Sequence, residues 1–136
     1  LILMFQKEVA NRIIAKPGNK DYGRLSVIAQ WCCQTKHLFD INPTAFTPPP
    51  KVVSSLIELK PREVPIFPAD RKYLEEITSL AFGHRRKMLR TNLKKIFGHP
   101  EIILSENGID PTARAETLSI EQFCKLSRHL SQIVNK

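Results

Sequence analysis

The stretch VVSSLIELKPREVPIFP, residues 52–68, decides how this chain is organised. Its first eight residues alternate in polarity, with Ile57 and Leu59 on one side, which is typical of a half-buried β-strand. Proline then recurs at positions 61, 65 and 68. Because proline lacks a backbone N–H and fixes φ, this spacing ends the strand and favours an irregular linker. The sequence therefore predicts two parts, residues 1–60 and residues 61–136.

The first part has the pattern of a small α/β unit, and the second has helical patterns alone. Hydrophobic periodicity predicts strands over residues 1–5, 36–41 and 52–59 and helices over residues 7–15 and 25–33. A loop over residues 42–50 joins the last two strands. In the second part we expect a helix capped by Asp70, helices over residues 85–97 and 101–107, and a final helix that begins at the capping box 119–122.

The composition is that of a folded chain with a basic surface. The 136 residues carry 21 Lys and Arg against 13 Asp and Glu, a formal charge of +8, and 42% are hydrophobic. These values exclude a large multidomain enzyme and a wholly disordered chain, and they favour a polyanionic partner, nucleic acid first. The three cysteines (32, 33 and 124) fit no metal spacing and are expected to be small buried side chains. We expect a reducing compartment, the cytoplasm.

The most basic segment, HRRKMLRTNLKK at residues 84–95, contains six Lys or Arg, and no acid occurs between Glu76 and Glu101. On a helix over residues 85–97, one side would gather Met88, Leu89, Leu93 and Ile96. The opposite side would gather Arg86, Lys87, Arg90 and Lys94. Such a row suits phosphates, although a run of this kind is more often a solvated face. Arg85 falls on the apolar side, where it would pair with a carboxylate or cap the domain junction.

Phe46 lies at the entrance of a stiff loop, followed by Thr47 and three prolines. Proline restricts the backbone, so the ring is held in a defined orientation at low entropic cost. It would either stack on an unpaired base or plug the edge of the core, and the bare sequence favours the second role. No other catalytic pattern stands out, because the four histidines form no ligand set and no Gly-rich phosphate loop occurs.

Together these segments resemble the ribosomal RNA adenine dimethyltransferases of the bacterial KsgA type. The matching stretches, spread in order over nearly the whole chain, are residues 3–10 (LMFQKEVA), 22–27 (YGRLSV), 45–53 (AFTPPPKVV), 81–93 (AFGHRRKMLRTNL) and 108–116 (GIDPTARAE). The last two stretches favour this branch over the related erythromycin-resistance methyltransferases, which act on the large subunit. The organellar and transcription-factor relatives are less easily excluded.

The resemblance implies an α/β remnant, the last three strands of a Rossmann-like methyltransferase sheet with helices, followed by a small all-α domain. Residues 1–60 would be the end of the S-adenosylmethionine-dependent domain and residues 61–136 the RNA-docking domain. By resemblance, Phe46 flanks the extruded adenine, and Arg85, Arg86, Lys87 and Arg114 belong to the basic surface that grips small-subunit RNA. The resemblance places Arg85 on the RNA-binding surface, whereas the helical wheel places it on the apolar side.

The resemblance also implies missing parts. The family's Gly-rich loop, its acidic strand end and its Asn-Leu-Pro-Tyr motif do not occur here, and residue 1 is Leu. We therefore expect a piece of a longer protein that by itself neither binds S-adenosylmethionine nor methylates RNA. Residues 1–5 would form an internal strand that has lost one neighbour, and such an apolar edge would self-associate or be disordered.

Two other classes of function remain open from the sequence. One is a non-catalytic RNA-binding or ribosome-assembly module, which an upstream in-frame methyltransferase motif would argue against. The other is a basic helical protein-interaction domain, which would lack the steep salt dependence of a protein that neutralises phosphates.

Overall fold

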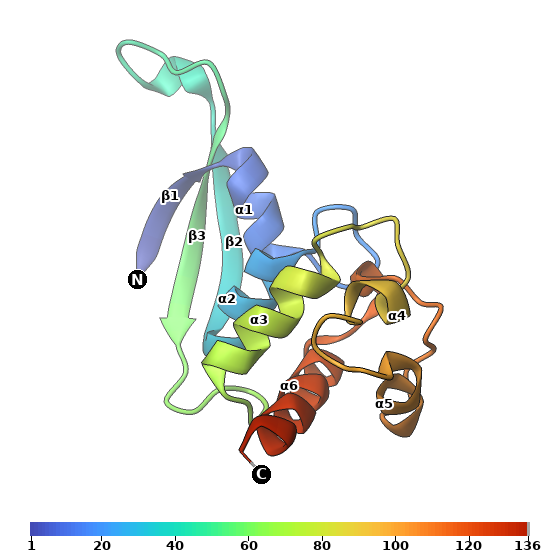
Figure 1. Cartoon of the computed structure of the whole chain (residues 1–136). Coiled ribbons are helices and arrows are strands. Elements are labelled where there is room, and N and C mark those ends of the chain that lie inside the picture. The colour runs from blue at the N-terminus through green and yellow to red at the C-terminus, as the bar shows by residue number, and fades with distance from the viewer. Residues whose placement is uncertain (136) are drawn as a thin grey trace.

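The structure is a computed structural model that describes residues 1–135. In chain order its elements are β1 (Ile2–Gln6), α1 (Lys7–Ile14), α2 (Arg24–Cys32), β2 (Cys33–Ile41), η1 (Pro43–Ala45), β3 (Ser54–Pro61), α3 (Arg71–Ala81), α4 (Leu89–Asn92), α5 (Pro100–Glu106), η2 (Ala115–Thr117) and α6 (Ile120–Val134). The sheet lies on one side and the later helices on the other, with α2 between them (Figure 1). No helix within residues 1–135 combines the length and apolar character needed to cross a bilayer.

The sheet has the strand order β1-β3-β2, and both pairings are antiparallel. Helices α1 and α2 cover one of its faces (Figure 1). On that face Ala10, Ile13 and Ile57 form a small buried cluster, and Leu59 packs against it, as the alternation predicts. The helix predicted to reach Cys33 ends one residue earlier, because Cys33 already pairs with Pro61 as the first residue of β2. The α/β fold class is thus confirmed.

β1 forms an apolar edge of the described sheet. It pairs with β3 alone, and Leu1, Ile2 and Met4 are 70%, 55% and 52% exposed. The predicted strand over residues 1–5 is therefore confirmed, and its second edge has no strand partner within residues 1–135. Self-association through this edge stays a prediction.

α2 connects the sheet to the helical part. The larger buried cluster joins Tyr22 and Trp31 to side chains of α3, α4 and α6. The linker is held against α2, because Trp31 Nε1 donates to the Phe67 carbonyl at 2.9 Å and the Ile66 N–H donates to the Trp31 carbonyl at 3.2 Å. The domain division near residue 60 stays a prediction, and one apolar core crosses it.

The cysteines follow the prediction in part. Cys124 is buried in the larger core, and burial raises the pKa of its thiol to about 12. Cys32 and Cys33 are only half-buried, with their sulfur atoms 3.8 Å apart. Cys32 is the last residue of α2 and Cys33 the first of β2, so the two thiols lie at the border of the core and are not fully buried.

Residues 85–97 do not form the single helix that the sequence predicts. In a continuous helix the N–H groups of Leu89 and Arg90 would donate to carbonyls four residues earlier. They donate instead to the carbonyls of Ala113 and Pro111, at 2.8 and 3.2 Å. The segment therefore folds as a turn, the short helix α4 and a second turn, because a loop far away in sequence competes for its donors.

The burial of this segment agrees with the predicted wheel only around α4. Leu89 and Leu93 are fully buried, and Ile96 packs against the core. Met88 was expected on the apolar side but is 39% exposed, since it precedes α4 as its N-cap residue. Asn92, a polar residue that the wheel did not single out, is buried and donates to the carbonyls of Ala81 and His84, at 2.9 Å each.

The loop that carries Phe46 is anchored by a polar cluster at its base. Asp40, one residue before the end of β2, accepts hydrogen bonds from Ser55 Oγ at 2.6 Å and from His37 Nε2 at 2.8 Å. Its second oxygen lies 3.1 Å from Lys7 Nζ. The bond from Ser55, with those from His37 and Lys7, holds the pKa of the Asp40 carboxyl well below its usual range. Asp40 therefore ties β2 to β3 and to the start of α1.

Replacing Asn92 tests whether its amide holds the basic segment together. Asn92→Ala leaves the Ala81 carbonyl without a donor and removes one of two donors to the His84 carbonyl, which keeps the Lys87 N–H at 3.0 Å. It should lower the free energy of unfolding by about 1–3 kcal/mol. The cost should fall toward the low end, because the buried Oδ1 of Asn92 itself lacks a partner. Asn92→Asp, which places a carboxylate against two carbonyls, should cost more. Denaturant unfolding measures both, with exposed Thr91→Ala as the control, and equal stabilities of the Asn92→Ala and Thr91→Ala variants would contradict the assignment.

The Asp40 cluster predicts a pH dependence of stability. The folded-state pKa is lowered, so the cluster's stabilisation is fully present above the unfolded pKa, near 4, and is lost as pH falls through the folded pKa. Asp40→Asn keeps the shape and removes the charge. We expect the wild-type advantage over this variant, measured by denaturant unfolding, to be constant from pH 5 to 7 and to shrink below about pH 5. The same advantage at pH 3 as at pH 7 would refute this role of the carboxylate.

Candidate RNA-binding surface

The cations predicted to face phosphates are all on the surface of the helical part. Exposed side chains include Arg86, Lys87, Arg90, Lys94 and Arg114. None of them forms an ion pair within residues 1–135, whose five pairs all lie elsewhere. Uncompensated cations on folded backbone suit the binding of a polyanion.

Tertiary structure brings Arg114 to this segment. The Leu89 N–H donates to the carbonyl of Ala113, the residue directly before Arg114. The loop after α5 is in turn shaped by Asp110, whose carboxylate accepts from the N–H and hydroxyl of Thr112 at 2.8 Å each. These bonds, the backbone one first, lower the pKa of the Asp110 carboxyl, and the nearby Arg90 adds to the effect. The charge pattern alone could not place Arg114, which lies 20 residues beyond Lys94 in the chain.

Arg85 behaves differently from its neighbours. Its Nη2 donates to the carbonyls of Tyr22 at 2.7 Å and Lys20 at 3.0 Å, and its guanidinium lies over the Phe82 ring, 5.4 Å from the centroid. A Cβ atom on Gly23 would come within 3.3 Å of Arg85 Nη1, so glycine leaves room for this contact. Of the two roles that the helical wheel left open for Arg85, the structure supports the cap of the junction. Its Nη2 is occupied by two protein carbonyls, while the side chain as a whole is exposed, and a contact of Arg85 with RNA stays a prediction.

The same junction gathers cations that the sequence analysis did not connect. Beside Arg85 a hollow of about 380 Å³ is lined in part by Arg12, Lys20 and Arg24. Arg12 is paired with Glu8 at 2.8 Å. These residues come from α1, from the following loop and from the first turn of α2. No periodicity links such segments, so only the fold could bring them together.

Phe46 is presented on a loop outside both buried clusters. The loop projects beyond the end of the sheet where β1 leads into α1 (Figure 1). Asn42 shapes its start by accepting from the Thr44 N–H at 3.0 Å, and the Phe46 N–H donates to the Pro43 carbonyl at 3.2 Å. Phe46 is half-buried, and residues 47–51 are exposed. Because Phe46 packs against neither cluster, the core-plug alternative gains no support.

The described residues do not fit an S-adenosylmethionine site. Such a site needs a Gly-rich turn at the end of a strand, where backbone can approach the ligand closely. All five glycines (18, 23, 83, 98 and 108) lie in turns before or after helices, and none follows a strand. No group of His, Cys, Asp or Glu within residues 1–135 could hold a metal ion. The expectation that the chain by itself does not bind the methyl donor stays a prediction.

Comparison with curated proteins finds close relatives. The chain is 57% identical over 127 residues to "Ribosomal RNA small subunit methyltransferase A" of Rhodospirillum rubrum, covering 93% of this chain and 44% of that protein. It is 50% identical to the protein of the same name from Bradyrhizobium sp. (strain ORS 278), covering 99% of this chain and 47% of the relative. The chain thus spans less than half the length of these relatives.

Solved structures share the fold at lower sequence identity. A dimethyladenosine transferase from Plasmodium falciparum matches 96% of this chain and 56% of its own, with a TM-score of 0.77 and 22% identity. The 23S rRNA methyltransferase ErmE also matches 96% of this chain, and 54% of its own, with a TM-score of 0.62 and 22% identity.

The family comparison extends over almost the whole chain. The sequence model of the family described as "Ribosomal RNA adenine dimethylase" matches residues 1–132. The match covers the strand β1, the Phe46 loop and the basic segment alike. The chain therefore belongs to the ribosomal RNA adenine dimethylase family.

Proposed function

We propose that this chain is the C-terminal portion of an enzyme that transfers methyl groups from S-adenosylmethionine to adjacent adenines of small-subunit ribosomal RNA. Its partner would be the assembling small ribosomal subunit, in the cytoplasm. The observation that supports this proposal most strongly is the 57% identity over 127 residues to a relative whose name is "Ribosomal RNA small subunit methyltransferase A". The whole enzyme's activity is proposed rather than assigned to this chain, which spans less than half of such relatives.

Within this proposal the chain supplies RNA docking and one wall of the target pocket. Arg86, Lys87, Arg90, Lys94 and Arg114 would neutralise phosphates, because these exposed side chains form no ion pair within residues 1–135. A base taken out of its stack needs an aromatic or apolar surface to rest on. The exposed loop with Phe46 provides such a surface.

The proposed methyl transfer depends mainly on how the enzyme positions the target adenine. The exocyclic nitrogen of adenine is a poor nucleophile because its lone pair is delocalised into the ring. S-adenosylmethionine supplies the electrophilic methyl group when bound to the complete enzyme. Stacking on Phe46 would restrict the orientation of the base, and this restriction lowers the entropic part of the barrier.

A second candidate is a non-catalytic RNA-binding or ribosome-assembly module. It is favoured by the exposed cations of the basic segment, which form no ion pair within residues 1–135 and could bind phosphates without a methyl donor. The intact mass of the protein isolated from its cells, compared with its gene, distinguishes the two. A mass matching the longer relatives supports the enzyme, and a mass near 15.6 kDa supports the module.

Neutralising two exposed cations should weaken RNA binding in a salt-dependent way. If Arg86 and Lys87 each contact one phosphate, Arg86→Gln combined with Lys87→Gln should reduce the slope of log affinity against log salt by about 1.4–1.8. Filter binding to small-subunit ribosomal RNA at several salt concentrations measures the slope.

The matched control for this experiment is the pair Arg71→Gln and Lys72→Gln. It removes the same charge at the other end of α3, about 15 Å from the basic segment. Equal slopes for the two double variants would show that net charge alone drives binding and would reject the proposed surface.

Phe46 should quench a fluorescent adenine analogue. In RNA that carries 2-aminopurine at the target adenine, stacking on the ring lowers fluorescence and contributes about 1–3 kcal/mol to binding. We expect Phe46→Ala to lose the quenching and Phe46→Tyr to keep it. Phe39, which is 55% exposed on β2, provides the control Phe39→Ala. Quenching that survives in Phe46→Ala would exclude the stacking role.

A further inference from the structure

A polar hollow lies at the end of the sheet remote from the Phe46 loop. It has a volume of about 440 Å³ and is lined by the first residues of β2, the last of β3, and parts of α2 and the linker. The strands pair from Cys33 with Pro61 at this end to Ile41 with Ser54 at the loop. Eight steps of about 3.3 Å separate the two ends by about 26 Å. The hollow is therefore distinct from the proposed adenine pocket.

Cations dominate the lining of this hollow. Four of its residues are Lys16, Lys36, Lys60 and Arg62, against the single acid Glu58. Lys60 lies 3.7 Å from Glu58, a long contact, and the other three cations have no ion pair within the described part of the chain. The hollow thus has a net charge of +3, which favours an anionic occupant.

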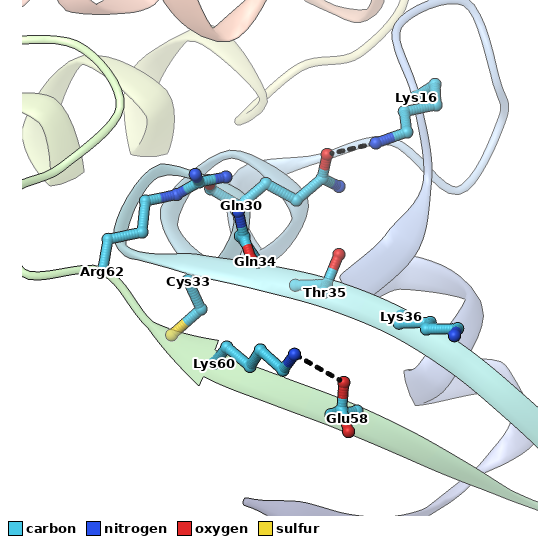
Figure 2. A pocket seen from close by; sticks show the side chains of 9 residues that line it. All are labelled: Lys16, Gln30, Cys33, Gln34, Thr35, Lys36, Glu58, Lys60 and Arg62. Carbon is cyan, nitrogen blue, oxygen red and sulfur yellow. Dashed lines mark hydrogen bonds and ion pairs between the residues drawn. The ribbon is translucent and has the colours of Figure 1, made fainter.

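A buried residue fixes two of these cations in place. Gln30 is only 6% exposed, and its Nε2 donates to the carbonyls of Ile13 and Ala15, at 2.9 and 2.7 Å. Its Oε1 accepts from Lys16 Nζ at 3.1 Å, and its backbone carbonyl accepts from Arg62 Nη2 at 3.4 Å. Figure 2 shows Lys16 and Arg62 on either side of Gln30, and Lys60 on β3, across β2 from Gln30 in this view. The two cations are therefore held in position before any ligand arrives.

Arg62 has unused hydrogen-bonding capacity. Its Nε–H is buried and has no acceptor within residues 1–135. This atom has no surface open to the hollow, whereas Nη1 of the same guanidinium forms no hydrogen bond within residues 1–135 and can donate to an oxygen of a bound anion. A guanidinium can also donate two parallel hydrogen bonds to a phosphate, which an ammonium group cannot.

We propose that this hollow binds a phosphate group, held by Arg62 and Lys16, while Lys36 and Lys60 on the other face of the sheet add positive charge at its rim. The phosphate belongs either to a small phosphorylated compound or to an RNA backbone, and the chemistry of recognition is the same. This proposal does not depend on the proposed methyltransferase function, because it is argued only from the charge and geometry of the hollow.

The test is a titration of the full chain with inorganic phosphate, followed by amide chemical shifts at constant ionic strength. Saturable shifts should cluster at residues 16, 30, 33–36 and 58–62. Lys16→Gln combined with Arg62→Gln should weaken binding about tenfold or more, since two charge-assisted contacts are lost. The pair Arg71→Gln and Lys72→Gln removes the same charge elsewhere and should leave binding unchanged.

A second double variant and an RNA arm complete the experiment. Lys36→Gln with Lys60→Gln replaces two exposed side chains and provides the same readout if the first variant fails to fold. With single-stranded RNA, a salt slope lowered by about 0.7 per lost phosphate contact identifies the backbone as the source. If the wild-type chain binds phosphate and the hollow variants leave the salt slope for RNA unchanged, the ligand is a small phosphorylated compound. Absent or dispersed phosphate shifts, or equal affinity in the hollow variants and the control, would overturn the proposal.

Discussion

The contact between α2 and the helical part is the constraint on which the rest of the structure depends. Trp31 of α2 and Tyr22, which lies two residues before α2, belong to one buried cluster with side chains of α3, α4 and α6. The rings of Tyr22 and Phe82 pack edge to face with their centroids 5.9 Å apart. The centroids of the Phe82 and Phe123 rings are 5.5 Å apart. Arg85 closes this junction from outside through the carbonyls of Lys20 and Tyr22. Full burial of each apolar side chain contributes about 1.5–3 kcal/mol, so the contact holds the two parts in one orientation.

This rigidity matters because the candidate functional groups lie on opposite sides of the junction. The Phe46 loop extends from the sheet, whereas the basic segment belongs to the helical part (Figure 1). An RNA bound through its phosphates reaches the ring in a fixed position only if the orientation is fixed. The junction shows why Arg85 differs from Arg86 and Lys87 although the three are adjacent. Its Nη2 donates to two backbone carbonyls across the junction, whereas the side chains of Arg86 and Lys87 form no hydrogen bond within the described residues.

The basic segment keeps its cations exposed without being a regular helix. Leu89 and Leu93, one helical turn apart, are fully buried, and Arg90 and Thr91 between them point outward. Asn92 donates to the carbonyls of Ala81 and His84, and the His84 carbonyl also accepts from the Lys87 N–H. The buried neutral side chains of Leu89, Asn92 and Leu93 thus hold the backbone on which the exposed cations of the basic segment lie close together. The cost of repulsion among the cations is limited by their exposure to water.

The sequence by itself determined the strands, most helix boundaries, the outward-facing cations and the family, because alternation, capping residues and long motifs are local signals. Only the tertiary structure decided the fate of residues 85–97, since the competing acceptors, Ala113 and Pro111, lie far along the chain. The same holds for Asp40, whose partners His37, Ser55 and Lys7 come from β2, β3 and the start of α1. It also holds for the cations around Gln30, which come from separate elements. Charge and hydrogen bonding act through space, and distance along the chain does not reveal which polar groups the fold brings together.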